Sequence, residues 1–118
     1  MSYMLLIVEP VGQRAQRTPA EGREAYAQML RYAESLKARG LLTHAESLKS
    51  DAEGVRLRMR DGERQLIDGP YAEAKEMIGG FFLVDCATRE EAVSIAERCP
   101  AAEWCTVEVR SLAPCYVS

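Results

Sequence analysis

The chain begins with a segment, residues 3–8, in which both sets of alternating positions are apolar. The two sets are Tyr3, Leu5, Ile7 and Met4, Leu6, Val8. Because successive side chains of a strand point to opposite faces, this pattern predicts a strand that is covered on both faces. Residues 78–86 predict another strand, which contains Gly79 and Gly80 and has the same two-sided apolar character over residues 81–84. Paired glycines in a strand predict a place where another backbone or a ligand approaches closely.

Two segments have the 3.6-residue period of amphipathic helices. The first begins at Thr18-Pro19-Ala20-Glu21, a capping box with proline at the first helical position, and Gly40 provides the left-handed exit. The residues of its apolar stripe are Tyr26, Met29, Leu30, Ala33 and Leu36. A second capping box, residues 88–91, begins a short helix that Pro100 stops.

Four further segments have strand patterns. Residues 41–48 predict a second strand, and residues 103–110 predict the last one. In residues 55–60, apolar side chains alternate with Arg56, Arg58 and Arg60, which predicts a half-buried edge strand with a charged outer face. The arginines protect the edge from unwanted pairing, or they recognise an anion or a protein. Asp61-Gly62 predicts a hairpin turn that returns through residues 64–67.

The resulting order is β-α-β-β-(short β)-β-α-β. Two helices on one face of an antiparallel sheet make an α+β, ferredoxin-like β-α-β-β-α-β fold, and the length predicts one domain over residues 1–118. Two helices cover only one face of such a sheet. The other apolar face therefore predicts a homodimer that buries at least about 1,200 Å² in total.

Composition narrows the class of protein. Hydrophobic residues make up 47% of the chain and charged residues 28%, as in an ordinary globular domain. The formal net charge is −3, without a basic block, so the sequence argues against a nucleic-acid partner. No apolar run approaches the roughly 20 residues of a membrane span, and the first residues lack the basic region of a signal peptide. We therefore expect a cytoplasmic protein that has no membrane partner.

The ionisable and sulfur-bearing residues do not form a cofactor motif. The four cysteines, Cys86, Cys99, Cys105 and Cys115, include no C-x-x-C pair, and the chain has one histidine. This spacing argues for buried or half-buried thiols and against a zinc site. No phosphate loop or dinucleotide fingerprint occurs, so we expect neither a cofactor nor a metal.

Residues 68–82, DGPYAEAKEMIGGFF, closely resemble the signature of the DGPF branch of the YCII-related family, with Tyr71 where that branch has phenylalanine. The similarity continues through residues 89–92, 97–100 and 107–110, and back to residues 3–6 and 40–42. The resemblance implies a ferredoxin-like fold and a dimer whose sheets form an α+β barrel. It also implies two kinds of role. Some relatives accompany extracytoplasmic-function sigma factors, and a few are lyases of chlorinated aromatic breakdown products with a proposed His–Asp dyad. This chain has no histidine directly after its first strand.

The signature loop supplies most of the candidate site residues. Asp68 is either a loop-holding carboxylate that bonds to backbone or a catalytic or ligand-binding group. Tyr71 is a packed ring with a usable hydroxyl. Glu73, Lys75 and Glu76 form either a solvated charged segment or a ligand-binding rim. In the second case Lys75 anchors an anionic substrate while a carboxylate moves a proton.

His44 and Glu46 form the second candidate pair. Alternation places them on one face of the second strand, about 7 Å apart along it. His44 is either a satisfied interior residue or, beside a carboxylate, a general base. If their face is the one toward the dimer, the pair lines a cavity there.

The resemblance, taken together with the candidate residues, implies two functions. The first is a cofactor-independent lyase- or isomerase-like enzyme that acts on a small anionic metabolite in a cleft at the dimer face, with Asp68, His44 or Glu46 moving protons. The second is a non-enzymatic module that binds a small ligand or regulates a sigma-factor system through a protein partner. We favour the first function by a narrow margin and keep the second as the alternative.

Overall fold

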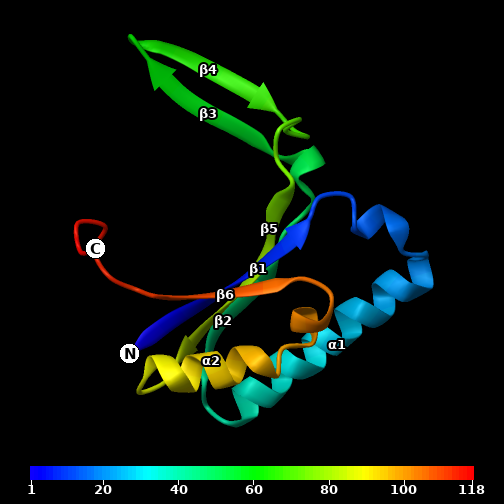
Figure 1. Cartoon of the computed structure of the whole chain (residues 1–118), viewed down its shortest axis with the longest axis vertical. Coiled ribbons are helices and arrows are strands. Elements are labelled where there is room, and N and C mark those ends of the chain that lie inside the picture. The colour runs from blue at the N-terminus through cyan, green and yellow to red at the C-terminus, as the bar shows by residue number, and fades with distance from the viewer.

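The computed structural model describes residues 1–118 and shows an α+β architecture (Figure 1). A four-stranded antiparallel sheet carries two helices, and a separate two-stranded hairpin projects from it. The elements are β1 (Ser2–Pro10), α1 (Pro19–Ala38), β2 (Leu42–Ser47), β3 (Val55–Arg60), β4 (Glu63–Asp68), β5 (Glu76–Asp85), α2 (Arg89–Glu97) and β6 (Thr106–Ser111). No helix of the chain combines the length and the apolar character that a membrane crossing requires.

The main sheet has the strand order β2-β5-β1-β6, and every neighbouring pair is antiparallel. This order agrees with the predicted ferredoxin-like fold. Both helices pack on the sheet face that carries Tyr3, Leu5 and Ile7, which are all buried. The Tyr32 ring of α1 meets the Phe82 ring of β5 edge to face, and its hydroxyl donates to the Ile95 carbonyl of α2. One core therefore joins the sheet to both helices.

The helix boundaries follow the predicted caps. The Thr18 hydroxyl accepts from the Glu21 N–H, and the Glu21 carboxylate accepts from the Thr18 N–H at 2.8 Å. Gly40 has a φ of +71°, as the predicted left-handed exit requires. At α2, the Thr88 hydroxyl accepts from the Glu91 N–H and so caps the helix. The Glu91 carboxylate, however, accepts from the N–H of Ala87, the residue before Thr88. The second box therefore closes one residue earlier than predicted.

The opposite face of the sheet has no helix on it. We call it the open face, and its apolar residues are Met4, Leu6, Val8, Phe81 and Leu83. Each of these side chains is half-buried within the single chain. The predicted cover is confirmed for the helix-facing side of β1 and β5, whereas the open face has no cover within one chain.

The hairpin β3–β4 differs from its prediction. Its bounds over residues 55–60 and its turn are correct, since Asp61 and Gly62 both have positive φ, as a tight hairpin turn requires. The predicted half-burial of β3 is wrong. All six residues are exposed because the hairpin extends away from the main sheet (Figure 1). The last strand also begins later than predicted, at Thr106, because Pro100 begins a 3₁₀ turn over residues 100–103.

Candidate functional site

A cleft of about 480 Å³ lies between α1 and the helix-facing side of the sheet. Its walls are mainly apolar and include the side chains Ile7, Tyr26, Met29, Phe82 and Trp104. Small-molecule sites in proteins are typically concave and apolar, with a few placed polar groups. The cleft has this character, and three of its charged residues decide its chemistry.

Glu9 is the buried charge of this cleft. It is 6% exposed and occupies the last helix-facing position of β1, in line with Leu5 and Ile7. A buried carboxylate needs a partner, because losing its hydration is costly. Arg14 is that partner. Its Nε lies 3.1 Å and 3.3 Å from the two Glu9 oxygens, and its Nη2 lies 2.5 Å from Oε1.

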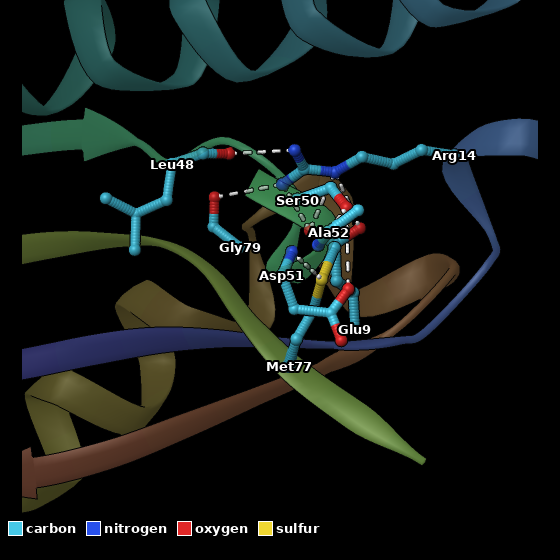
Figure 2. Close-up of polar contacts among 8 residues, drawn as sticks. All are labelled: Glu9, Arg14, Leu48, Ser50, Asp51, Ala52, Met77 and Gly79. Atoms are coloured by element: carbon cyan, nitrogen blue, oxygen red, sulfur yellow. Dashed lines mark hydrogen bonds and ion pairs between the residues drawn. The ribbon is translucent and has the colours of Figure 1, made fainter. Parts of the chain in front are cut away.

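Arg14 is held from a second side by backbone carbonyls, as Figure 2 shows. Its Nη1 donates to the Leu48 carbonyl at 2.8 Å, and its Nη2 contacts the Gly79 carbonyl at 3.3 Å. The guanidinium therefore links β1 to the end of β2 and to β5. Bidentate pairing with additional carbonyl contacts fixes the position of both charged groups.

The paired glycines make room for this arrangement. A Cβ on Gly79 would lie 1.7 Å from the Glu9 Oε1 atom, and a Cβ on Gly80 would lie 2.7 Å from the Glu46 carbonyl oxygen. The predicted close approach of another backbone is confirmed at Gly80, where the neighbouring strand β2 lies. At Gly79 the approaching groups are instead the side chains of Glu9 and Arg14.

Arg17 is the third charged residue of the cleft. It is half-buried, and its guanidinium carbon lies 5.5 Å from the centre of the Trp104 ring. Its side chain makes no hydrogen bond or ion pair within the chain. The cleft therefore combines a neutralised pair, Glu9–Arg14, with a cation that has no carboxylate partner.

The thiol in the cleft is a weak acid. Burial, and after it the negative charge of Glu9, raises the pKa of Cys105 to about 11. Because the thiol stays protonated near neutral pH, Cys105 is a poor nucleophile. All four cysteines are free, and no three His, Cys, Asp or Glu side chains gather as metal ligands would.

His44 and Glu46 are brought together as predicted, but outside the cleft. The His44 Nε2 atom lies 3.0 Å from the Glu46 Oε2 atom, and both side chains are more than half exposed. The register places them opposite Leu83 and Phe81 on the open face. Glu46 is also among the residues that line the cleft, while its carboxylate lies beside the His44 ring on the open face.

The signature loop lies at the base of the hairpin. Tyr71 packs beneath the Arg56 guanidinium, 3.7 Å from the ring centre, and Glu73 pairs with the same guanidinium at 3.7 Å. Asp68 is the exposed last residue of β4, opposite Val55. Asp68 makes no hydrogen bond or ion pair through its side chain.

The end of this loop returns the chain to the main sheet. Lys75 and Glu76 are exposed, the Lys75 carbonyl accepts from the Val11 N–H, and Glu76 pairs with Pro10. No hydrogen bond or ion pair connects the loop to His44 or Glu46. Tyr71 and Glu76 do line one small cavity of about 280 Å³, but neither Asp68 nor the His44–Glu46 pair lines it, so the predicted candidates do not form a single site.

The charged residues of the cleft were missed because they come from separate segments. Glu9 carried a usable signal, since it continues the inward set of Tyr3, Leu5 and Ile7. A carboxylate at an inward position of a strand requires a partner. Nothing in the sequence identifies Arg14 as that partner, because it lies in the connection before α1.

Comparison with known proteins is consistent with this architecture. A family model described as the YCII-related domain matches residues 1–115. An uncharacterized protein of Rhizobium meliloti (strain 1021) is 46% identical over 59 residues, which cover 48% of each protein, so the alignment spans about half the length of this curated relative. Among solved structures, a similar one is the 5-chloro-2-hydroxyhydroquinone dehydrochlorinase of Burkholderia phenoliruptrix in complex with 2,5-dihydroxybenzoquinone. Its TM-score is 0.55 at 18% identity, with 96% of this chain and 94% of the other covered, which shows a shared fold.

Proposed function

The chain belongs to the YCII-related family, and we propose that it is a cofactor-independent enzyme with lyase- or isomerase-like chemistry on a small anionic metabolite. The substrate occupies the cleft beneath α1. One observation carries this proposal: the buried Glu9 carboxylate lies in an otherwise largely apolar cleft. The structural neighbour supports a small-molecule role, since it is a dehydrochlorinase of the same fold.

Glu9 is the proposed proton acceptor. A carbon–hydrogen bond of the substrate breaks, its electron pair stays on the substrate, and the proton moves to the carboxylate. In an isomerisation the proton returns at another carbon. In an elimination a leaving group departs with its electron pair. Arg14 positions Glu9 through the Nε and Nη2 contacts, which leaves the carboxylate little freedom to turn away.

A non-enzymatic binding module is the second candidate. Two observations favour it: Arg14 contacts both oxygens of Glu9, and no histidine lines the cleft. In this case Glu9–Arg14 is a structural pair, and the cleft senses a ligand for a regulatory partner such as a sigma-factor system.

Hydrogen–deuterium exchange separates the two functions. The probe is 2,5-dihydroxybenzoquinone in D₂O, with the ring C–H signal followed by proton NMR. The enzyme is expected to accelerate loss of this signal, and Glu9→Gln is expected to lower the rate by about 10²–10⁴-fold. The matched control Glu24→Gln, an exposed residue of α1, keeps the wild-type rate. Equal rates for Glu9→Gln and wild type would refute Glu9 as the base, and saturable binding without catalysed exchange would favour the binding module.

We further propose that two copies associate through the open face as a dimeric α+β barrel. The supporting observation is the row of half-buried apolar side chains around Leu6, which have no cover within one chain. His44 and Glu46 then lie within the interface. Sedimentation equilibrium is expected to give twice the chain mass, and Leu6→Glu to give monomers, while Val117→Glu in the exposed tail leaves the dimer intact. A monomeric wild type would refute this arrangement.

A further inference from the structure

The Arg17 guanidinium has donors that the protein does not use. The guanidinium carbon lies 5.5 Å from the centre of the Trp104 ring, and the face of this ring attracts the positive charge. The ring is not a hydrogen-bond acceptor for the N–H groups, which point outward in the guanidinium plane. A guanidinium has five N–H donors in a planar fork. No protein acceptor bonds to any of them at Arg17, although the residue is half-buried at the cleft.

The nearby carboxylates are already engaged. Glu9 is paired with Arg14, and the Glu46 carboxylate lies 3.0 Å from the His44 Nε2 atom on the open face. Glu21 accepts from the Thr18 N–H at the start of α1. The hydrogen bonds with Thr18, and after them the nearby Arg17 charge, lower the pKa of this exposed carboxyl, but no ion pair joins Glu21 to Arg17. Arg17 therefore gives the cleft a net attraction for an anion, and its free fork matches the two oxygens of a carboxylate.

The walls beside Arg17 are suited to a flat ring. Trp104, Tyr26 and Phe82 contribute aromatic surfaces, and Met29 adds a polarizable thioether. These groups favour a planar apolar body over a hydrated or highly polar one.

We propose that Arg17 and Trp104 make the cleft selective for aromatic carboxylates. The carboxylate receives paired N–H donors from Arg17, and the ring lies against Trp104 and the apolar side of α1. This inference rests on the proposed function, because it names the substrate class of the same cleft. Arg17 is then a specificity residue, and Glu9 keeps its separate role at the reacting carbon.

Fluorescence titration tests the inference directly, because Trp104 is the only tryptophan in the chain. The probes are benzoate, benzamide and cyclohexanecarboxylate at constant ionic strength. Benzoate is expected to change the emission in a saturable way, with an apparent Kd at least tenfold lower than the Kd of either other probe. Arg17→Gln is expected to weaken benzoate binding at least tenfold, and Arg17→Lys to give an intermediate loss because it keeps only the charge.

Two further variants keep the test specific to the cleft. Arg23→Gln removes the same charge from an exposed position of α1 and is expected to leave the benzoate Kd unchanged. Ala25→Phe fills the cleft and is expected to abolish the signal. Each variant is first checked for a wild-type circular dichroism spectrum.

The outcomes separate this inference from the proposed function. Benzamide binding as tightly as benzoate, an unchanged Kd in Arg17→Gln, or a persistent signal in Ala25→Phe would each overturn the selectivity for aromatic carboxylates. If any of these results is found while the protein still catalyses exchange of 2,5-dihydroxybenzoquinone, the proposed enzymatic function stands and only the selectivity for aromatic carboxylates is refuted. If the protein binds benzoate selectively but does not catalyse exchange, the proposed enzymatic function is refuted and the selectivity for aromatic carboxylates stands.

Discussion

Replacing Gly79 by alanine perturbs the Glu9–Arg14 pair without touching either charged residue. The new Cβ would lie 1.7 Å from the Glu9 Oε1 atom and 2.9 Å from the Arg14 Nη2 atom. Ordinary van der Waals contact begins at about 3.4 Å, so the carboxylate must move by roughly 1.7 Å or the strand must shift. Either movement breaks the shortest contact of the pair.

The cost follows from the burial of the two groups. Breaking a fully buried ion pair by removing one partner costs about 3–5 kcal/mol. Here Glu9 has an 8% exposed side chain, whereas Arg14 is 34% exposed and regains some hydration. We therefore expect Gly79→Ala to lower the free energy of unfolding by about 2–3 kcal/mol. For a domain of this size that corresponds to a Tm lower by roughly 6–15 °C.

Urea denaturation followed by Trp104 fluorescence measures the effect, with calorimetry for Tm. Gly22→Ala is the matched control, because a Cβ at this helical glycine of α1 meets nothing within 4 Å. It is expected to raise the free energy of unfolding by about 0.5–1 kcal/mol. The two alanine substitutions should therefore change stability in opposite directions.

A double-mutant cycle identifies the cause. In a Glu9→Ala background the clashing carboxylate is gone, so Gly79→Ala should cost less than about 1 kcal/mol. A change in Tm of less than 2 °C in Gly79→Ala would refute a clash with the Glu9 carboxylate. An equal loss of unfolding free energy in the presence and in the absence of Glu9 would refute it as well.

Three further predictions concern pH, capping and the hairpin. Burial raises the pKa of Cys105 from 9.0 to about 11, so the folded state holds the thiol proton more tightly. Its stabilising contribution is complete below pH 9 and is lost as pH rises toward 11. Calorimetry should show Tm falling over this range, and a fall just as steep in Cys105→Ala would contradict the assignment. Thr18→Ala removes the capping box of α1 and should cost about 1 kcal/mol in urea denaturation, whereas an unchanged midpoint would show that the cap is dispensable. In Gly69→Ala the Cβ would lie 1.7 Å from the Asp51 carbonyl oxygen. The base of the hairpin should loosen and its arginines should be cut faster by trypsin, and wild-type cleavage would refute this.

The parts of the fold that local chemistry specifies could be predicted from the sequence. The capping box at Thr18, the exit at Gly40 and the turn at Asp61-Gly62 depend on side chains only a few residues apart. The strand order follows from that succession of elements together with the general rules for connections in α+β sheets. The α+β class was therefore within reach of sequence reasoning.

The site was less predictable because its contacts join distant segments. His44 and Glu46 were correctly paired, since they are two residues apart on one strand. The partnership of Glu9 with Arg14 depends on how the connection after β1 folds back onto the end of β2. The exposure of β3 could not be predicted either, because alternation shows which side chains share a face but not whether anything covers that face.

The strand order has a consequence for how the chain folds during synthesis. The central strand β1 is paired only with β5 and β6, which come from the second half of the chain. Tyr3, for example, lies opposite Val84 and Ser111. During synthesis, β1 therefore leaves the ribosome long before β5 and β6. Until these two strands are made, β1 stays unpaired, with apolar side chains on both faces. This interval is when the nascent chain is most exposed to aggregation and most in need of a chaperone.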